Sequence, residues 1–141
     1  MCIELRVMEI GDYQQVFALW KVSEGLRLNA DDSLESISHF LDRNPGMSFV
    51  AMENGKVVGA ALCGYDGRVG YIHNLAVDKK HRKKGIAKSL VGRCMFELVK
   101  LGIHRCHLYV ENDNQAGINF WKKLGWEQRV EMISMSQPIR P

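Results

Sequence analysis

The stretch between Asp78 and Lys88 concentrates the positive charge of this 141-residue chain. It holds six basic residues and one acidic residue, a net charge of +5, whereas the other 130 residues together carry −2. Such a local concentration indicates a site for a compact anion rather than a basic face laid along a nucleic acid. The chemistry that this stretch predicts is therefore the binding of a phosphate-bearing ligand.

Within this stretch, the run Arg82-Lys83-Lys84-Gly85-Ile86-Ala87 has the pattern of an anion-binding helix start. The first N–H groups of a helix have no partners inside the helix, and the helix start carries about half a positive charge. Glycine and alanine in the first turn leave room for a bulky anion, and the flanking bases add charge. The run is neither a GxxxxGK[ST] phosphate loop nor a GxGxxG dinucleotide fingerprint. We expect it to hold a pyrophosphate.

To position this run, a strand must end before it and a helix must begin at Gly85. Three apolar runs precede it, at residues 49–52, 57–65 and 69–77, separated by Asn54-Gly55 and Asp66-Gly67. Asn-Gly between apolar runs is the strongest short hairpin signal, so the three runs predict an antiparallel meander. After Gly85, apolar residues recur at helical spacing until a glycine closes the helix at position 102.

The rest of the chain completes an alternating pattern of strands and helices. A strand is predicted at 3–7, helices at 12–20 and 33–43, a strand at 103–110, a helix at 114–124 and a last strand at 126–135. The two late strand-helix-strand crossovers require locally parallel strands in an otherwise antiparallel sheet. The sequence thus predicts an α/β fold with a mixed, mostly antiparallel sheet covered by helices.

On these residues, the chain resembles the GNAT N-acetyltransferase superfamily. In that family the pattern Q/R-x-x-G-x-G/A opens the third helix and binds the pyrophosphate of acetyl-CoA, and the run from Arg82 to Ala87 matches it. The segment Asn74–Asp78 resembles the family's central strand. In the family, that strand splays away from its parallel neighbour and its free backbone groups bind the pantetheine amides.

A second block of the family's sequence stands further along the chain. The run from Asn114 to Trp126 resembles the block N-x-x-A-x-x-x-Y-x-K-x-G-F, with Gly117 in place of the alanine and Trp121 in place of the tyrosine. The resemblance spans essentially the whole chain. It is greatest to small bacterial acetyltransferases of the YpeA kind, and more distant to the ribosomal-protein alanine acetyltransferases.

The resemblance implies a GNAT-like sheet with helices on both faces, splayed central parallel strands, and acetyl-CoA as the cosubstrate. The residues that it implies for binding acetyl-CoA are Leu75, Ala76, Val77, Arg82, Lys83, Lys84, Gly85, Ile86, Ala87, Lys88, Asn114 and Trp121.

The family's reaction is the direct attack of an amine on the acetyl thioester, without a covalent enzyme intermediate. The backbone N–H of Leu75 is the implied donor to the developing oxyanion. The family's usual general acid is the tyrosine that Trp121 replaces, and an indole N–H is no general acid near neutral pH. The family's usual glutamate bases are also replaced. The candidates that remain for proton transfer are Tyr71, His73, Tyr109 and Glu111.

The composition limits the other possibilities. The length predicts one domain over residues 1–141, and four scattered cysteines without a CxxC pair predict free thiols in a cytoplasmic protein. No apolar run reaches membrane-spanning length, no histidine has metal-ligand spacing, and no aromatic platform accompanies the basic cluster, so we expect no membrane, metal or nucleic acid. A catalytically idle acyl-CoA-binding module is the alternative to an enzyme, and the short C-terminal part leaves a homodimer open.

Overall fold

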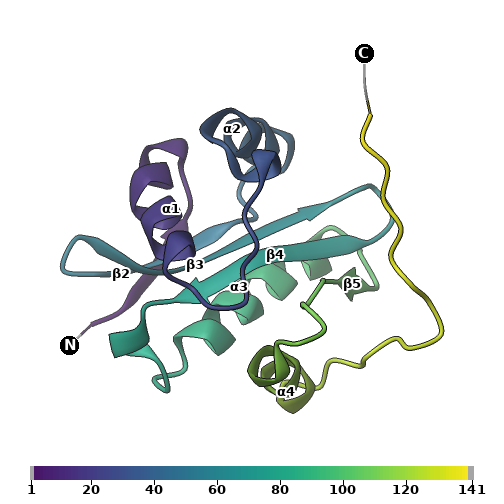
Figure 1. The fold of residues 1–141 in the computed structure, drawn as a ribbon. Helices are drawn as coiled ribbons and strands as arrows, with labels where there is room; N and C mark the ends of the chain where they lie inside the picture. The colour runs from purple at the N-terminus through teal and green to yellow at the C-terminus, as the bar shows by residue number, and fades with distance from the viewer. Residues whose placement is uncertain (1, 140–141) are drawn as a thin grey trace.

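The computed structural model of this chain describes residues 2–139, in which a five-stranded sheet separates two pairs of helices (Figure 1). The strands are β1 (Glu4–Val7), β2 (Phe49–Glu53), β3 (Lys56–Tyr65), β4 (Gly70–Val77) and β5 (Cys106–His107). The helices are α1 (Tyr13–Lys21), α2 (Leu34–Arg43), α3 (Ile86–Lys100) and α4 (Gln115–Lys123). Short 3-10 turns lie at Ile10–Asp12, Ala30–Asp32 and Lys79–His81.

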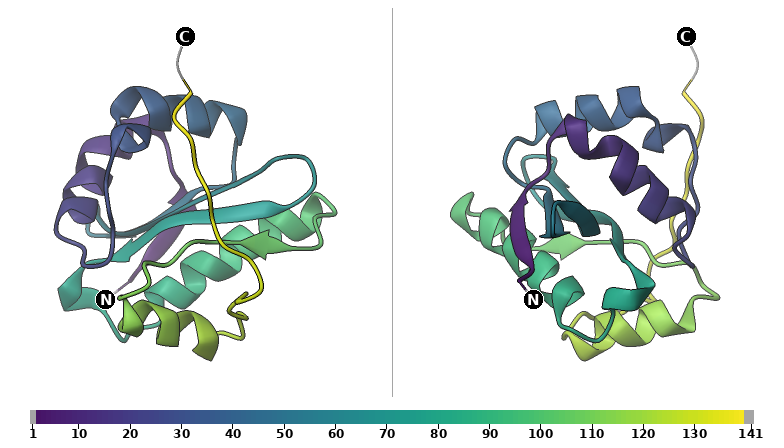
Figure 2. Two further views of the ribbon diagram at one scale, coloured as in Figure 1. Left: turned by 45° about the vertical axis from the view of Figure 1, so that its right-hand side comes forward. Right: turned by 90° about the vertical axis from the view of Figure 1, so that its left-hand side faces the viewer.

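The sheet is covered on both faces, with α1 and α2 on one side and α3 and α4 on the other (Figures 1 and 2). Strand β2 illustrates why, since successive side chains of a strand point to opposite faces. Phe49 and Ala51 pack in the cluster that contains Leu90 of α3, whereas Val50 packs in the cluster that contains Trp20 of α1. The predicted α/β class with helices on both faces is confirmed.

The predicted meander is present, and its turns have the expected chemistry. The strands lie in the order β1-β2-β3-β4-β5, and the first four are antiparallel to their neighbours. Asn54 and Gly55 join β2 to β3 with φ of 50° and 77°, the left-handed pair that a tight hairpin prefers. Between β3 and β4, the carboxylate of Asp66 accepts hydrogen bonds from the N–H groups of Arg68 and Val69 at 2.8 and 2.9 Å.

Strand β4 is irregular at the point where the site forms. Ala60 pairs with Ala76 and Leu62 pairs with His73, so the two residues Asn74 and Leu75 lie opposite one residue of β3. This is a β-bulge, which re-aims the side chains that follow it. Asn74 has a left-handed φ of 51°. On its other side β4 is parallel to β5, but only Gly70 and Tyr71 have register partners there.

The predicted strand over residues 103–110 is therefore much shorter than expected. Only Cys106 and His107 are paired with β4. Beyond Tyr71 of β4 and His107 of β5, the two chain segments are no longer paired. Apolar alternation indicates a segment that suits a strand, but the strand forms only where it can pair with the edge of another strand. Along most of residues 103–110, the described residues supply no such edge. The family's splayed parallel strands, which the resemblance implied, are present in this form.

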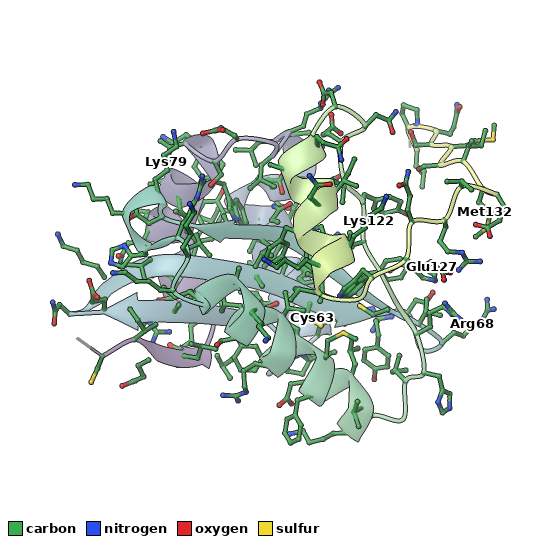
Figure 3. All side chains as sticks on the ribbon, turned by 90° about the horizontal axis from the view of Figure 1, so that it is seen from below. Cys63, Arg68, Lys79, Lys122, Glu127 and Met132 are labelled. Carbon is green, nitrogen blue, oxygen red and sulfur yellow. The ribbon has the colours of Figure 1, made fainter. Side chains whose placement is uncertain are left out.

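The predicted last strand over residues 126–135 is wrong: residues 126–139 lie in neither a helix nor a strand. Two-residue β5 offers too short an edge for a further strand, and the segment's alternating apolar side chains remain exposed, Val130 at 81% and Ile133 at 84%. Figure 3 shows Glu127 and Met132 on this segment at the end of the molecule opposite to Lys79. Within residues 2–139, none of the helices combines the length and apolar character needed to cross a membrane.

Candidate active site

Two cavities meet at β4, one on each side of its bulge. The larger, of about 710 Å³, lies between the second half of β4, the start of α3 and the inner face of α4. The other, of about 670 Å³, lies between β4, α2 and the connection from α1 to α2. His73, Asn74 and Tyr109 line both cavities. The two cavities therefore adjoin each other at β4, at the connection from α1 to α2 and at Tyr109.

The first cavity collects the residues that the sequence predicted for acetyl-CoA. Of the twelve, only Lys84 does not line it. The others that line it are Leu75, Ala76, Val77, Arg82, Lys83, Gly85, Ile86, Ala87, Lys88, Asn114 and Trp121. The cavity therefore brings together three parts of the chain that are separate in sequence: the end of β4, the basic run and the start of α4.

The basic run forms an anion cradle at the start of α3. Lys83 and Gly85 both have left-handed φ, 64° and 80°, which turns the backbone so that the helix begins abruptly at Ile86. Ser89 is the first residue to donate a backbone hydrogen bond into the helix, to the carbonyl of Gly85 at 3.0 Å, so the N–H groups before it stay free for a ligand. A Cβ placed on Gly85 would meet nothing within 4 Å, and Gly85, Ile86, Ala87 and Lys88 all line the first cavity. This geometry fits a pyrophosphate.

A half-buried cluster of one histidine and two carboxylates lies between the cradle and the sheet. The imidazole of His81 bonds the Glu53 carboxylate through Nε2 and the Asp78 carboxylate through Nδ1, each at 2.8 Å. These hydrogen bonds, first to Glu53 and then to Asp78, raise the pKa of His81 above its ordinary value of 6.5. Arg82 adds a hydrogen bond from Nε to the carbonyl of Val77 at 3.3 Å. Sequence reasoning missed this cluster, because Glu53 and His81 are 28 residues apart.

Replacing His81 by glutamine should destabilise the protein more at pH 6 than at pH 9. A histidine whose pKa is raised by folding contributes its stability below the unfolded pKa and loses it as the pH rises through the folded pKa. The measurement is urea unfolding of the wild-type chain and His81→Gln at both values, with His104→Gln as the control because His104 is exposed. If the difference in unfolding free energy between the wild-type chain and His81→Gln were the same at both pH values, the raised pKa of His81 in this cluster would be contradicted.

The backbone of β4 is open beside the first cavity. Among the described residues, Asn74 and Leu75 have no register partner on β3, and β5 pairs only with the first two residues of β4. A strand with free N–H and C=O groups is a template for pairing with another extended, amide-bearing chain. The predicted oxyanion donor, the N–H of Leu75, thus belongs to a part of the strand that the sheet leaves available.

Of the four candidates for proton transfer, His73 has the best placed side chain. It lines both cavities, and its ring packs edge-on against Phe40 at 5.9 Å and parallel to Tyr71 at 6.0 Å. Burial lowers the pKa of His73 below its ordinary value of 6.5, and the nearby carboxylate of Asp32 partly opposes this effect. The imidazole is therefore neutral at pH 7 and able to accept a proton.

The other three candidates are placed less favourably. Tyr71 shares the face of His73, as strand alternation predicted, but in the described part of the chain it lines neither cavity. Tyr109 lines both cavities and is 71% exposed. Glu111 lines the second cavity, where it forms an ion pair with Arg27.

The start of α4 is fixed by Asn114, one of the predicted cofactor residues. Its side-chain oxygen accepts a hydrogen bond from the N–H of Gly117 at 3.0 Å and so caps the helix. A Cβ on Gly117 or on Gly25 would collide with this amide, so a larger residue at either position would displace the cap. Trp121 packs against Trp126 with ring centroids 5.0 Å apart, and its indole lines the first cavity.

The connection between α1 and α2, residues 22–33, contacts several elements of the site. Sequence reasoning did not predict these contacts. Figure 1 shows the connection crossing from α1 past the end of β4 and back to α2. Glu24 pairs with Lys79 at 2.9 Å, Arg27 pairs with Glu111, and Asp32 accepts a hydrogen bond from the side chain of Asn74 at 2.7 Å. No sequence motif signals these contacts, because each joins residues far apart in the chain.

Over the same residues 2–139, no group of three or more His, Cys, Asp and Glu side chains is placed to hold a metal ion. What the site offers is an anion cradle, an open strand, and a second cavity across that strand. A mixed sheet whose parallel pair separates beside a glycine-opened helix is the architecture that the resemblance to the acetyltransferases implied.

Comparison with known proteins gives the family. The sequence profile described as "Acetyltransferase (GNAT) family" matches residues 13–126. An acetyltransferase of Pectobacterium atrosepticum is 34% identical over 137 residues, which cover 97% of this chain and 96% of that protein. The chain belongs to the GNAT family and is an N-acetyltransferase.

Solved structures agree with this fold. The structure of Ard1 from Thermoplasma volcanium has a TM-score of 0.78 at 22% identity, over 89% of this chain and 82% of that one. A predicted acetyltransferase from Clostridium acetobutylicum, solved with acetyl-CoA, has a TM-score of 0.76 at 20% identity, over 96% of both chains.

Proposed function

We propose that this protein transfers the acetyl group of acetyl-CoA to a primary amine by direct attack within a ternary complex. The observation that carries the proposal is that the two cavities meet at the β4 bulge, where both are lined by His73 and Asn74. Acetyl-CoA bound in the first cavity and an amine bound in the second would meet at these residues. Holding both reactants at one point supplies the proximity on which a direct transfer depends.

The donor half of the site is assigned to the cradle and the open strand. The N–H groups at the start of α3 would bind the pyrophosphate, with Arg82, Lys83, Lys84 and Lys88 adding positive charge around it. The backbone of Leu75, Ala76 and Val77 would bind the pantetheine amides. The N–H of Leu75 would donate to the oxyanion as the amine attacks.

His73 is assigned as the base that takes the proton from the attacking amine. Its neutral ring lies where the cavities meet, whereas Glu111 is paired with Arg27 and Tyr71 lines neither cavity. Trp121 stands where a tyrosine acid would stand and cannot donate a proton to the leaving thiolate. A thiol with a pKa near 8.5 is an acceptable leaving group with hydrogen-bond help alone.

The acceptor should be an amine of low pKa, such as an α-amine. About a fifth of an α-amine with a pKa of about 7.7–8.0 is neutral near pH 7.2, against less than about 0.1% of a lysine amine near 10.4. A base whose pKa is lowered by burial is poorly suited to take a proton from a lysine ammonium. The site therefore favours acceptors that are already partly neutral.

Two measurements test the function, and both use the wild-type chain. Acetyl-CoA at about 100 times its dissociation constant should raise the free energy of unfolding by about 2.7 kcal/mol. Initial rates against amines of graded pKa should fall from α-amines to lysine. Equal or faster rates on lysine side-chain amines than on α-amines would contradict the assignment of an acceptor amine of low pKa. Binding of acetyl-CoA without turnover of any amine would instead favour the alternative motivated by Trp121, an idle acyl-CoA-binding module.

Some predictions from the sequence remain proposals: a single domain over residues 1–141, a cytoplasmic location, the YpeA subgroup and a homodimer. The exposed apolar side chains of the C-terminal segment support the last of these, with Met135 at 86% and Val130 at 81% exposure. A second copy of the chain that covered this segment would bury them.

A further inference from the structure

The carboxylate of Asp32 links the connection between α1 and α2 to the β4 bulge. The residue is 9% exposed. Its Oδ1 accepts a hydrogen bond from Nδ2 of Asn74 at 2.7 Å, and its Oδ2 accepts one from the N–H of Asn29 at 3.0 Å. Its backbone carbonyl accepts the hydroxyl hydrogen of Tyr13 at 2.6 Å. Asp32 is thus held by α1 and by its own turn, and presents one oxygen to β4.

Asn74 is the residue of the bulge whose backbone needs support. Its φ of 51° lies in the left-handed region, which asparagine tolerates but which costs free energy for any residue with a side chain. Such a conformation persists where its surroundings hold it. The hydrogen bond from the Asn74 side chain to Asp32 is a contact from outside the sheet. His73 and Leu75, the two residues on either side of Asn74, are those assigned to the chemistry.

We propose that Asp32 is a positioning residue for acetyl transfer, which holds Asn74 in its left-handed conformation and thereby keeps His73 and the Leu75 backbone in their reactive geometry. The inference rests on the proposed function and goes beyond it, because Asp32 acts through Asn74 and need not touch donor or acceptor. Small displacements of this kind are expensive, since a misplacement of about 1 Å at a reacting centre costs roughly 100-fold in rate.

The charge of Asp32 provides a second readout. His73 is packed between Phe40 and Tyr71, and the carboxylate that raises its pKa against the effect of burial is that of Asp32. The other titratable or charged side chains that line the same cavity are Arg27, Asp31, His39, Arg43, Tyr109 and Glu111. All of these remain when Asp32 alone is neutralised, so that change should lower the pKa of His73 further.

The first test compares Asp32→Asn with Glu35→Gln. The control removes the same charge from an exposed residue in the first turn of α2, outside both cavities. We expect Asp32→Asn to reduce kcat roughly 10–100-fold while the KM for acetyl-CoA stays within about twofold. The imidazole resonances of His73, followed by NMR, should titrate at lower pH, and the acid limb of kcat/KM should move with them. Glu35→Gln should change neither.

The second test removes the other partner of the hydrogen bond. Asn74→Gly accepts the left-handed backbone without steric cost but has no amide to bond Asp32. Its kcat should fall as in Asp32→Asn, with the pKa of His73 little changed because the carboxylate remains. A wild-type kcat in Asn74→Gly, or an Asp32→Asn chain that matches Glu35→Gln in both kcat and the pKa of His73, would overturn the inference.

Failure of the inference can be told apart from failure of the proposed function. If the wild-type chain acetylates amines and Asp32→Asn does so equally well, only the positioning role is wrong. If the wild-type chain acetylates no amine, the proposed function is wrong and the positioning role is wrong with it.

Discussion

Replacing Gly85 by valine should weaken the binding of acetyl-CoA by at least about 100-fold, since the pyrophosphate would lose charge-assisted hydrogen bonds of about 1.5–3 kcal/mol each. Gly85 has a left-handed φ of 80°, which a β-branched residue adopts only with strain. Gly85 also lines the first cavity, where a valine side chain would occupy space that the pyrophosphate needs. Isothermal titration of acetyl-CoA into the purified variant measures the effect.

The matched control for this change is Gly92→Val in the same helix. Gly92 is exposed, its φ is not in the left-handed region, and a Cβ there would likewise meet nothing within 4 Å. Valine is a slightly better helix former than glycine, so the control should fold as stably as the wild-type chain and bind acetyl-CoA unchanged. If Gly85→Val is folded and binds acetyl-CoA as tightly as Gly92→Val does, the anion cradle is not where we place it.

Replacing His73 by glutamine should reduce kcat by about 100-fold or more, the usual contribution of a positioned general base. In the wild-type chain, activity should fall as the pH drops through the pKa of His73, because the protonated imidazole cannot accept a proton. Burial lowers this pKa, so the loss should come at a pH below the ordinary value of 6.5. Measuring kcat and kcat/KM against pH gives both the loss of rate in His73→Gln and the fall of wild-type activity at low pH. The variant should lack this fall at low pH.

His104→Gln serves as the control, because His104 is exposed and lies outside both cavities. It should keep the wild-type rate and pH profile. A His73→Gln chain with the wild-type rate and an intact acid limb would assign proton transfer to another group, and Tyr109 would then be the next candidate because it also lines both cavities.

The sequence by itself determined the parts of this protein that depend on neighbouring residues. The Asn54-Gly55 hairpin and the abrupt helix start at Gly85 follow from backbone preferences that need no distant partner. The proposed donor site could be predicted for the same reason, since ten of the twelve residues predicted to bind acetyl-CoA lie in one run between Leu75 and Lys88, and nine of these ten line the first cavity. A ligand held by consecutive N–H groups of a helix start leaves its pattern in the local sequence.

Only the tertiary structure decided the parts that depend on long-range pairing. The hydrogen bond between Asp32 and Asn74 joins residues 42 apart, and the cluster of Glu53 and His81 joins residues 28 apart, without a local pattern to predict either. Tyr71 and His73 share a face, yet only His73 reaches the cavities.

The last predicted strand, over residues 126–135, failed for a related reason. Alternation of apolar residues indicates which side of a strand would be buried, but a strand forms only where it can pair with the edge of another strand. The two paired residues of β5, Cys106 and His107, do not supply one of sufficient length. Local periodicity thus determined which segments suit a sheet, and the separation of β4 from β5 decided where the sheet ends and the site begins.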